Sequence, residues 1–242
     1  MQNLVGDEEH SRLDAIAADS HYGLGANLAT IAHSFEVLKR HIRPGPILEM
    51  GPAEGNMTAE LAILNQPLTV VEGAAPFCDS LRARFPDIEI VHSLFEAFEP
   101  ADQFETIVLG HVLEHVDDPV GILSAAKGWL TPTGRILAAV PNARSLHRQA
   151  AVIMGLLPFE ESLNDADRHH GHRRVYNPET YRRDFREAGL NIEVFGGYWL
   201  KPLSNSQIER DWTPEMLSAF MTLGERYPDI AGEIYVVARR GA

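Results

Sequence analysis

A short run of small residues between two apolar segments constrains the fold of this chain more than any other feature. Residues 47–50 (ILEM) are apolar enough to end a buried strand, and residues 51–55 (GPAEG) then form a sharp turn. Residues 56–64 follow with apolar side chains at helical spacing. A strand, a glycine turn and a helix in this order present backbone N–H groups to a ligand at the carboxyl end of the strand. The feature therefore predicts an α/β protein with a ligand site at this turn.

The glycine spacing in this turn excludes two common nucleotide-binding motifs. Gly51 and Gly55 are four apart with Ala53 between them, so the turn is not G-x-G-x-x-G, and no Lys-Ser/Thr follows, so it is not a P-loop. The pattern E-x-G-x-A-x-G, which begins at Glu49, resembles motif I of class I S-adenosylmethionine (SAM)-dependent methyltransferases, usually D/E-x-G-x-G-x-G. Ala53 replaces the middle glycine. The resemblance implies that Glu49, Gly51, Ala53 and Gly55 hold SAM; a turn without a ligand is the alternative.

An acidic residue ends the second predicted strand, residues 68–72 (LTVVE). Glu72 lies 23 residues after Glu49, close to the separation of about 20 residues at which a carboxylate meets a ribose in dinucleotide-binding folds. A carboxylate can accept two hydrogen bonds from a ribose diol. Glu72, followed by Gly73, is therefore predicted to bind the ribose, and its charge argues against NADP. An ordinary carboxylate at a strand end is the alternative.

The third predicted strand, residues 88–91, leads into three candidate adenine contacts. The methyltransferase family usually has an acidic residue here that binds the adenine amine, and this chain has Ser93. The resemblance implies that Leu94 and Phe95 flank the adenine ring. A purely structural role for Phe95 in the core stays open.

The block from residue 104 to residue 142 carries the most specific resemblance. A predicted strand at 104–110 is followed by LEHV at 113–116, Asp118-Pro119, LTPTG at 130–134 and PN at 141–142. This order resembles the strand-four-to-strand-five block of class I methyltransferases, particularly the quinone-biosynthesis group and methyltransferase-domain families 11 and 23. The resemblance covers residues 45–142 well and the remainder loosely. It implies SAM as the cofactor and S-adenosylhomocysteine as the product.

The alternation of predicted strands and helices, together with this resemblance, predicts a Rossmann-like doubly wound α/β sheet of about seven strands. The expected strand order is 3-2-1-4-5-7-6, with the last strand antiparallel. Asn177 and Pro178 are predicted to open a helix that Gly189 ends, before a sixth strand over residues 192–200. The chain is read as one domain, whose parts are a helical lid (1–44), a SAM-binding core (45–142), a substrate-cap insertion (143–176) and the C-terminal part of the sheet (177–242).

His111 is the predicted catalytic residue, because it directly follows the fourth strand, where the sulfonium of SAM is expected. Methyl transfer is an in-line displacement at an activated methyl group, so the enzyme mainly supplies proximity and orientation. A hydroxyl or ammonium acceptor also needs a base. A wall of the cofactor pocket is the alternative role for His111.

Residues 111–115 also spell H-x-x-E-H, an inverted zinc-protease motif whose ligands would share one face of a helix. The methyltransferase block around it argues against a protease, and His115 is predicted to be structural. A divalent ion at His111, Glu114 and His115, as in some quinone-type methyltransferases, stays open. No metal ligand is included in the predicted site.

Residues 168–176 (RHHGHRRVY) form a basic island in an acidic chain. Arginine binds carboxylate or phosphate groups bidentately, so the island is predicted to belong to a substrate cap that recognises an anionic group. A metal held by the three histidines and a solvated loop paired with nearby acids stay open. The predicted substrate residues are His169, His170, His172, Arg173 and Tyr176, with Tyr22 from the N-terminal segment.

The net charge of −13 at pH 7 argues against nucleic acid as a partner. One cysteine and an acidic start without an apolar core predict a cytoplasmic protein without a signal peptide. The longest apolar stretch, near residues 150–159, is too short to span a bilayer. The expected partner is a small-molecule acceptor, without nucleic acid or membrane, and the expected assembly is a monomer or homodimer.

Together these features predict transfer of a methyl group from SAM to an oxygen or nitrogen of a small molecule. The basic island favours an anionic acceptor, such as a sugar-like, phosphorylated or secondary-metabolite scaffold. The alternatives are a quinone- or lipid-type O-methyltransferase and a non-catalytic SAM-binding scaffold. A dehydrogenase, which would bind a nicotinamide cofactor instead, is the least favoured.

Overall fold

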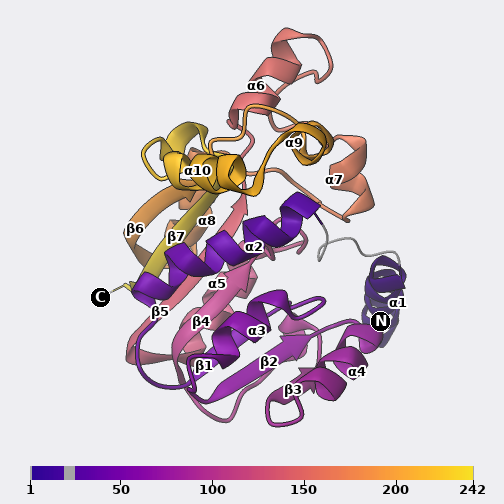
Figure 1. Ribbon diagram of the computed structural model, residues 1–242. Coiled ribbons are helices and arrows are strands. Elements are labelled where there is room, and N and C mark those ends of the chain that lie inside the picture. The colour runs from indigo at the N-terminus through magenta and orange to yellow at the C-terminus, as the bar shows by residue number, and fades with distance from the viewer. Residues whose placement is uncertain (1, 19–24, 242) are drawn as a thin grey trace.

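The computed structural model describes residues 2–18 and 25–241, with only the backbone for residues 2–5 and 7. The described chain contains a seven-stranded sheet in the order β3-β2-β1-β4-β5-β7-β6 (Figure 1). β7 is antiparallel to both of its neighbours, and the other neighbouring pairs are parallel. The predicted fold class and strand order are confirmed. The strands are β1 (Ile47–Met50), β2 (Leu68–Glu72), β3 (Glu89–His92), β4 (Phe104–Gly110), β5 (Leu130–Pro141), β6 (Leu190–Tyr198) and β7 (Glu233–Arg240).

Helices cover both faces of the sheet, because alternate residues of each strand point to opposite sides. In β5, Ile136 and Ala138 pack into the core beneath one face, whereas Leu137 and Ala139 pack into the core beneath the other. The first face is covered by α5 (Pro119–Trp129) and α8 (Pro178–Glu187). The second is covered by α2 (Gly25–Leu38), α3 (Asn56–Ala62), α4 (Ala75–Arg84), α9 (Asn205–Asp211) and α10 (Pro214–Gly224).

The remaining helices gather near the carboxyl ends of the parallel strands. α1 (Gln2–Ala18) lies beside α4 (Figure 1), and the Asp14 Oδ1 atom accepts a hydrogen bond of 2.9 Å from the Ala75 N–H. α6 (Leu146–Ile153) and α7 (Asp165–His169) follow β5, and α6 projects from the body of the molecule (Figure 1). Three 3-10 turns complete the described elements, at Lys39–His41, Phe95–Ala97 and Pro228–Ile230.

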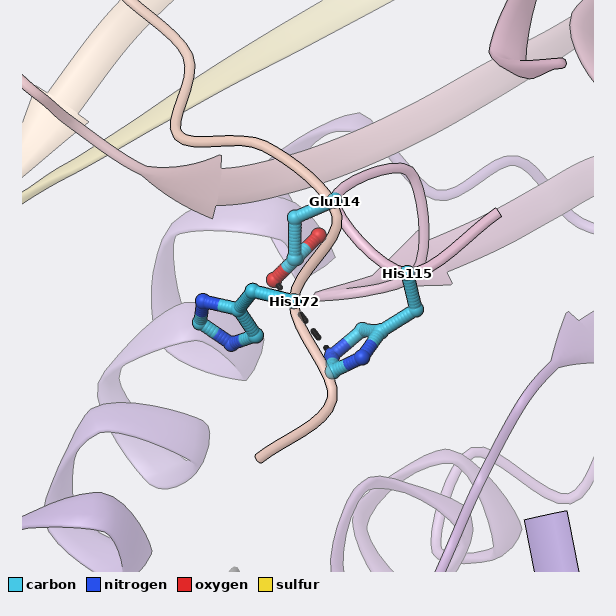
Figure 2. A group of neighbouring side chains, drawn as sticks. All are labelled: Glu114, His115 and His172. Carbon is cyan, nitrogen blue, oxygen red and sulfur yellow. Dashed lines mark ion pairs between the residues drawn. The ribbon is translucent and has the colours of Figure 1, made fainter. Parts of the chain in front are cut away.

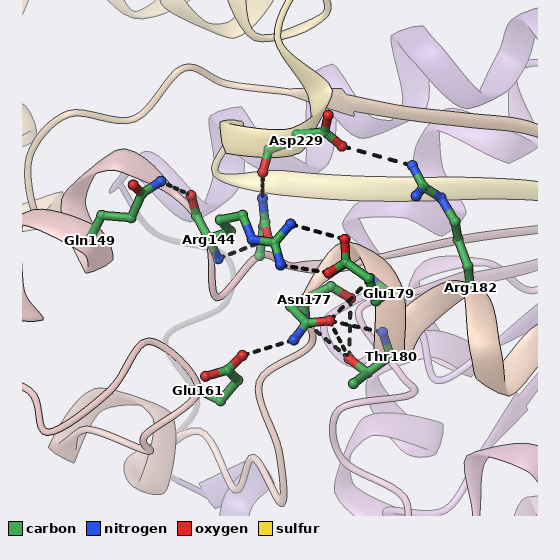
Figure 3. A network of polar contacts seen from close by, with 9 residues as sticks. Arg144, Gln149, Glu161, Asn177, Glu179, Thr180, Arg182 and Asp229 are labelled. Carbon is green, nitrogen blue, oxygen red and sulfur yellow. Dashed lines mark hydrogen bonds and ion pairs between the residues drawn. The ribbon is translucent and has the colours of Figure 1, made fainter.

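The sequence predicted the start of α8 from its cap, and the structure confirms it. Asn177 Oδ1 accepts hydrogen bonds from the N–H groups of Glu179 and Thr180, and Thr180 Oγ1 accepts one from the Asn177 N–H (Figure 3). Gly189 follows the helix with a positive φ of 72°, as expected for the residue that ends it. The predicted strand at 192–200 instead spans Leu190–Tyr198, because pairing with β7 runs from Leu190 to Tyr198.

Polar contacts fix the end of β5 against α8 and β7. Arg144 and Glu179 form a bidentate ion pair with N–O distances of 3.0 and 2.6 Å (Figure 3). The Asn142 amide donates to the backbone carbonyls of Asp229 and Ala231 at 3.1 and 2.8 Å. The PN pair at the end of β5 therefore positions the chain that leads into β7.

Candidate active site

A cavity of about 1530 Å³ lies along the carboxyl edge of the sheet. Gly51, Glu72, Ser93 and His111 line one part of it and follow or end β1, β2, β3 and β4; we call this the β1–β4 half. The other part, the β5–β7 half, is lined by residues at the end of β5, after β6 and at the start of β7. β7 contributes its first residue because it is antiparallel, and Glu233 pairs with Pro141 and Tyr198.

Three residues of the turn after β1 have left-handed backbone conformations. Gly51 has φ of 67°, and a Cβ there would lie 3.0 Å from Val112 Cγ2, so a side chain would fill the cavity wall. Ala53, in place of the usual glycine, keeps φ at 48°, a conformation that costs a non-glycine residue roughly 1–2 kcal/mol. Gly55 does not line the cavity: a Cβ there would meet Leu81 Cδ2 at 2.5 Å, so this glycine permits α3 to pack on α4.

Two buried carboxylates lie in the β1–β4 half. Glu49 is 2% exposed, accepts a hydrogen bond of 2.7 Å from Thr58 Oγ1, and has its pKa raised to about 8, chiefly by burial. Glu72 is 6% exposed, and its two oxygens accept hydrogen bonds from the Ala74 and Ala53 N–H groups at 2.8 and 3.3 Å. Burial raises the pKa of Glu72, and these N–H bonds oppose the rise.

The other predicted cofactor residues lie at the same end. Gly73, Ser93, Leu94 and Phe95 all line the cavity. Ser93 Oγ donates to the Leu94 carbonyl at 2.9 Å. Phe95 faces the turn, since its Cζ atom would lie 3.4 Å from a Cβ on Gly51, and it also packs against the core.

His111 lies where the two halves of the cavity meet and pairs with Glu233. It has a left-handed φ of 58°, an unusual conformation for a non-glycine residue, and its N–H donates to the Ala139 carbonyl. Its Nε2 atom is 3.0 Å from Glu233 Oε2. Burial lowers the pKa of His111, but the hydrogen bond and charge of Glu233 outweigh this effect and raise it.

The H-x-x-E-H sequence is not on a helix, because residues 111–116 form a turn. Figure 2 instead shows Glu114 and His115 beside His172. One possible ligand atom from each of the three residues lies within 4.8 Å of the others. Both Glu114 oxygens are buried without a hydrogen-bond partner, and these residue types are zinc ligands. Among the described residues, this is the group that could hold a metal ion. Glu114 and His115 belong to one of the two metal sites that the sequence left open, and His172 belongs to the other. His111, His169 and His170 are not part of this group.

The basic island divides between the cavity and the loop that follows β4. His170 and His172 line the cavity, and His169 does not. Arg173 also lies outside the cavity lining: its Nε donates to the His115 carbonyl at 2.8 Å, and its other nitrogens pair with Asp117 and Glu9 at 2.6 and 3.1 Å. Arg173 therefore holds the loop and α1 together instead of facing a ligand.

Tyr176 requires a correction. It is 2% exposed, lies in the core against Tyr181, and does not line the cavity. Its hydroxyl donates to Asp184 Oδ2 at 2.9 Å. The hydroxyl that was expected to contact substrate is therefore buried and already hydrogen-bonded within the core. Tyr22 lies outside the described residues.

Three residues that line the β5–β7 half were not predicted from the sequence: Glu233, Lys201 and His147. Glu233 had a weak signal, an acidic residue that opens an apolar strand. In an antiparallel β7 that residue lies beside the carboxyl ends of the parallel strands. Lys201 and His147 had no comparable signal.

The strand order with an antiparallel β7, and a ligand cavity at the glycine turn, define a class I SAM-dependent methyltransferase. Residues 22–193 match a family described as a methyltransferase domain, Methyltransf_23. The match spans more than half of the chain, so the protein belongs to this family and is a SAM-dependent methyltransferase. Its cofactor is SAM and its product is S-adenosylhomocysteine.

Known proteins resemble the chain at moderate distance. It is 29% identical over 181 residues to the ubiquinone biosynthesis O-methyltransferase of Dinoroseobacter shibae, covering 72% of this chain and 71% of that protein. The N-methyltransferase NodS of Bradyrhizobium japonicum, solved with S-adenosylhomocysteine, superposes with a TM-score of 0.63 at 14% identity, covering 96% and 97% of the two chains. A Burkholderia thailandensis 1,6-didemethyltoxoflavin N1-methyltransferase superposes with a TM-score of 0.59 at 14% identity, covering 89% of this chain and 80% of that chain. The two structures show the fold alone.

No helix within residues 2–18 and 25–241 combines the length and the apolar character that a membrane span requires.

Proposed function

We propose that this enzyme methylates an oxygen or nitrogen of a small molecule and that His111 is the base. The observation that carries the proposal is the pair between His111 Nε2 and Glu233 Oε2 at 3.0 Å, where the two halves of the cavity meet. A histidine oriented by a carboxylate is a common arrangement for proton abstraction. The pair would lie between the cofactor and the acceptor.

The β1–β4 half fits SAM. Glu72 has two lone pairs on each oxygen, so the backbone bonds to Ala53 and Ala74 leave acceptor capacity for a ribose diol. Gly51 leaves open the space that a Cβ would fill. We assign Glu72 and Gly73 to the ribose, and Ser93, Leu94 and Phe95 to the adenine. Glu49, Gly51 and Ala53 are assigned to the remainder of the cofactor, with Gly55 supporting the turn from behind.

The size of the cavity supports a second, small ligand. Pockets for one drug-sized ligand typically measure about 300–1,000 Å³, and this cavity measures about 1530 Å³. The cavity is therefore larger than one such ligand requires, and its β1–β4 half already fits the cofactor. The β5–β7 half is therefore the proposed acceptor site.

The chemistry assigned to His111 follows from its partner. SAM supplies an electrophilic methyl group on a sulfonium. A neutral His111 that donates its Nε2 proton to Glu233 carries its lone pair on Nδ1. We propose that Nδ1 accepts the proton of a hydroxyl or ammonium acceptor and that Glu233 orients the imidazole ring.

Isothermal titration of the dialysed protein with SAM, S-adenosylhomocysteine and NAD tests the cofactor assignment. We expect micromolar binding of both adenosyl ligands and none of NAD. Transfer of labelled methyl from SAM to a panel of hydroxyl and amine acceptors then tests the reaction. Binding of NAD in preference to both adenosyl ligands would contradict the proposal.

The pH dependence of turnover tests His111 and Glu233. A base must be neutral, so turnover should rise with pH through the pKa of His111, which Glu233 raises. The Glu233→Gln variant removes this charge, so the rise should move to lower pH. The His111→Gln variant should lose about 10²–10⁴-fold in turnover with unchanged cofactor affinity. If turnover survives in His111→Gln, the residue is only a wall of the pocket.

A quinone- or lipid-type acceptor is the second candidate. The curated relative named above is a ubiquinone biosynthesis O-methyltransferase. In addition, Ile153, Met154, Leu156 and Phe159 expose apolar side chains at and after α6, and an exposed apolar group of this kind marks an interaction surface. Sedimentation of the purified protein with phospholipid vesicles would favour this candidate, and its absence would favour a freely dissolved acceptor.

A further inference from the structure

Lys201 lies at the carboxyl edge of the sheet, three residues after β6 ends. β6 is parallel to β5 because both are antiparallel to β7, so its end reaches the same edge as the end of β5. The side chain is half-buried and lines the β5–β7 half of the cavity, with Nζ 4.4 Å from the centre of the Trp199 ring. Lys201 therefore lines the proposed acceptor site.

The other two lysine or arginine side chains among the described cavity residues have carboxylate partners. Arg12 pairs with Glu9 at 2.6 Å, and Arg148 pairs with Asp167 at 3.0 Å. Lys201 has no carboxylate within ion-pair distance among residues 2–18 and 25–241 whose side chains are described. Of the three described lysine and arginine residues that line the cavity, Lys201 is therefore the one whose charge no carboxylate pairs.

The acids whose charges act on Lys201 already have partners. Glu233 pairs with His111, Asp167 pairs with Arg148, and Glu209 accepts a hydrogen bond of 2.8 Å from the Ala26 N–H. Burial lowers the pKa of Lys201 to about 8, against the opposing charge of Glu233. A bound anion would offset this cost of burying an unpaired ammonium.

His147 adds a neutral polar group beside Lys201. Its backbone N–H donates to the Lys201 carbonyl at 3.1 Å, and its Nδ1 atom is buried without a hydrogen-bond partner. Burial and the neighbouring charge of Lys201 lower the pKa of His147 to about 3, so the imidazole is neutral at pH 7. Both side chains line the cavity, so Lys201 supplies the positive charge at this place and the neutral His147 adds none.

We propose that Lys201 forms an anion subsite for the methyl acceptor, which binds a carboxylate or phosphate group of the acceptor while the atom to be methylated faces His111. This inference rests on the proposed function, because it requires the β5–β7 half to hold the acceptor. The sequence had assigned anion binding to the basic island, but Arg173 of that island binds the loop after β4. The proposal assigns anion binding instead to Lys201, after the end of β6. Lys201 then selects the acceptor without taking part in proton transfer.

Matched probes test the subsite on protein saturated with S-adenosylhomocysteine. Benzoate is compared with benzamide, and 3,4-dihydroxybenzoate with its amide; inorganic phosphate and phenyl phosphate form the phosphate arm. Binding is followed by ligand-observed NMR up to about 10 mM, a concentration that detects even millimolar affinities. The variants are Lys201→Met, which keeps the stem over Trp199, and Lys201→Arg, which keeps the charge. Lys39→Met is the control, since Lys39 pairs with Glu36 outside the cavity.

We expect an anionic probe to bind wild type about tenfold tighter than its neutral match, as one charge-assisted contact allows. Lys201→Met should lose this preference, whereas Lys201→Arg and Lys39→Met should keep it. The carboxylate and phosphate arms decide which anion fits. Absence of any anionic preference in wild type, including failure of every anion to bind, overturns the proposal, as does a preference that survives in Lys201→Met.

Affinity for S-adenosylhomocysteine, measured before any probe is added, separates the remaining outcomes. A loss of about tenfold or more in Lys201→Met would place the ammonium on the cofactor's own carboxylate and would overturn the subsite. Failure of wild type to bind S-adenosylhomocysteine would instead contradict the proposed function itself. Unchanged cofactor affinity with lost anion preference supports the subsite.

Discussion

Replacing Glu49 by glutamine should change how the stability of this protein depends on pH. Glu49 is fully buried beneath the turn after β1, and burial raises its pKa from 4.5 to about 8. The unfolded chain therefore releases this proton above pH 4.5, whereas the folded chain keeps it up to about pH 8. Stability from Glu49 is fully present below pH 4.5 and is lost as the pH rises toward 8. The loss is about 1.4 kcal/mol per pH unit across that window.

The Glu49→Gln variant has no proton to lose and keeps an oxygen that can accept the Thr58 hydrogen bond, which measures 2.7 Å in the wild type. Urea unfolding of the cofactor-free proteins at pH 5.5, 6.5 and 7.5 should show the variant gaining on the wild type by about 1 kcal/mol or more per pH unit. Glu99→Gln, which removes a charge at an exposed position, is the control and should show no such trend. A constant difference between Glu49→Gln and wild type would refute the reasoning, because a carboxyl group that ionises freely in the fold carries no such linkage.

Three further perturbations test other assignments. Glu72→Gln should weaken binding of S-adenosylhomocysteine by more than about tenfold, since charge-assisted bonds contribute about 1.5–3 kcal/mol each; unchanged affinity by titration calorimetry would remove the ribose assignment. Tyr176→Phe should lower the free energy of unfolding by about 1–3 kcal/mol, because Asp184 loses a buried donor, with cofactor affinity unchanged. Lost turnover at full stability would return Tyr176 to the substrate site. Dialysis against a chelator should leave turnover unchanged, since displacement at a sulfonium needs no Lewis acid; activity lost and then restored by Zn²⁺ would assign a metal to the cluster around Glu114.

The sequence determined the elements whose signals are local. The bounds of β1, β2 and β4 coincide with their apolar runs, and Asn177 and Gly189 mark the ends of α8. The glycine turn predicted the place of the ligand cavity, because a strand, a turn and a helix in sequence have one geometry wherever they occur. The strand order came from the family resemblance, and the structure confirms it.

Local signals did not distinguish a polar side chain that faces a ligand from one that supports the fold. Arg173 and Tyr176 stand in the same polar segment as His170 and His172, yet only the two histidines line the cavity. Arg173 was assigned to an anion from its charge, and its guanidinium instead binds Glu9, Asp117 and a backbone carbonyl. A residue type states which partners it prefers, but the partner that reaches it depends on how distant segments pack.

Only the tertiary structure decided the composition of the β5–β7 half of the cavity. Glu233 is 122 residues from His111 in the chain, and the two meet because β7 runs antiparallel between β5 and β6. That arrangement brings the start of β7, the end of β5 and the segment after β6 to one edge of the sheet. The sequence by itself determined where the β1–β4 half would form, since its turn is encoded by consecutive residues. The pairing of His111 with Glu233 and the place of Lys201 without a carboxylate partner were decided by strand pairing over long separations, which no local pattern encodes.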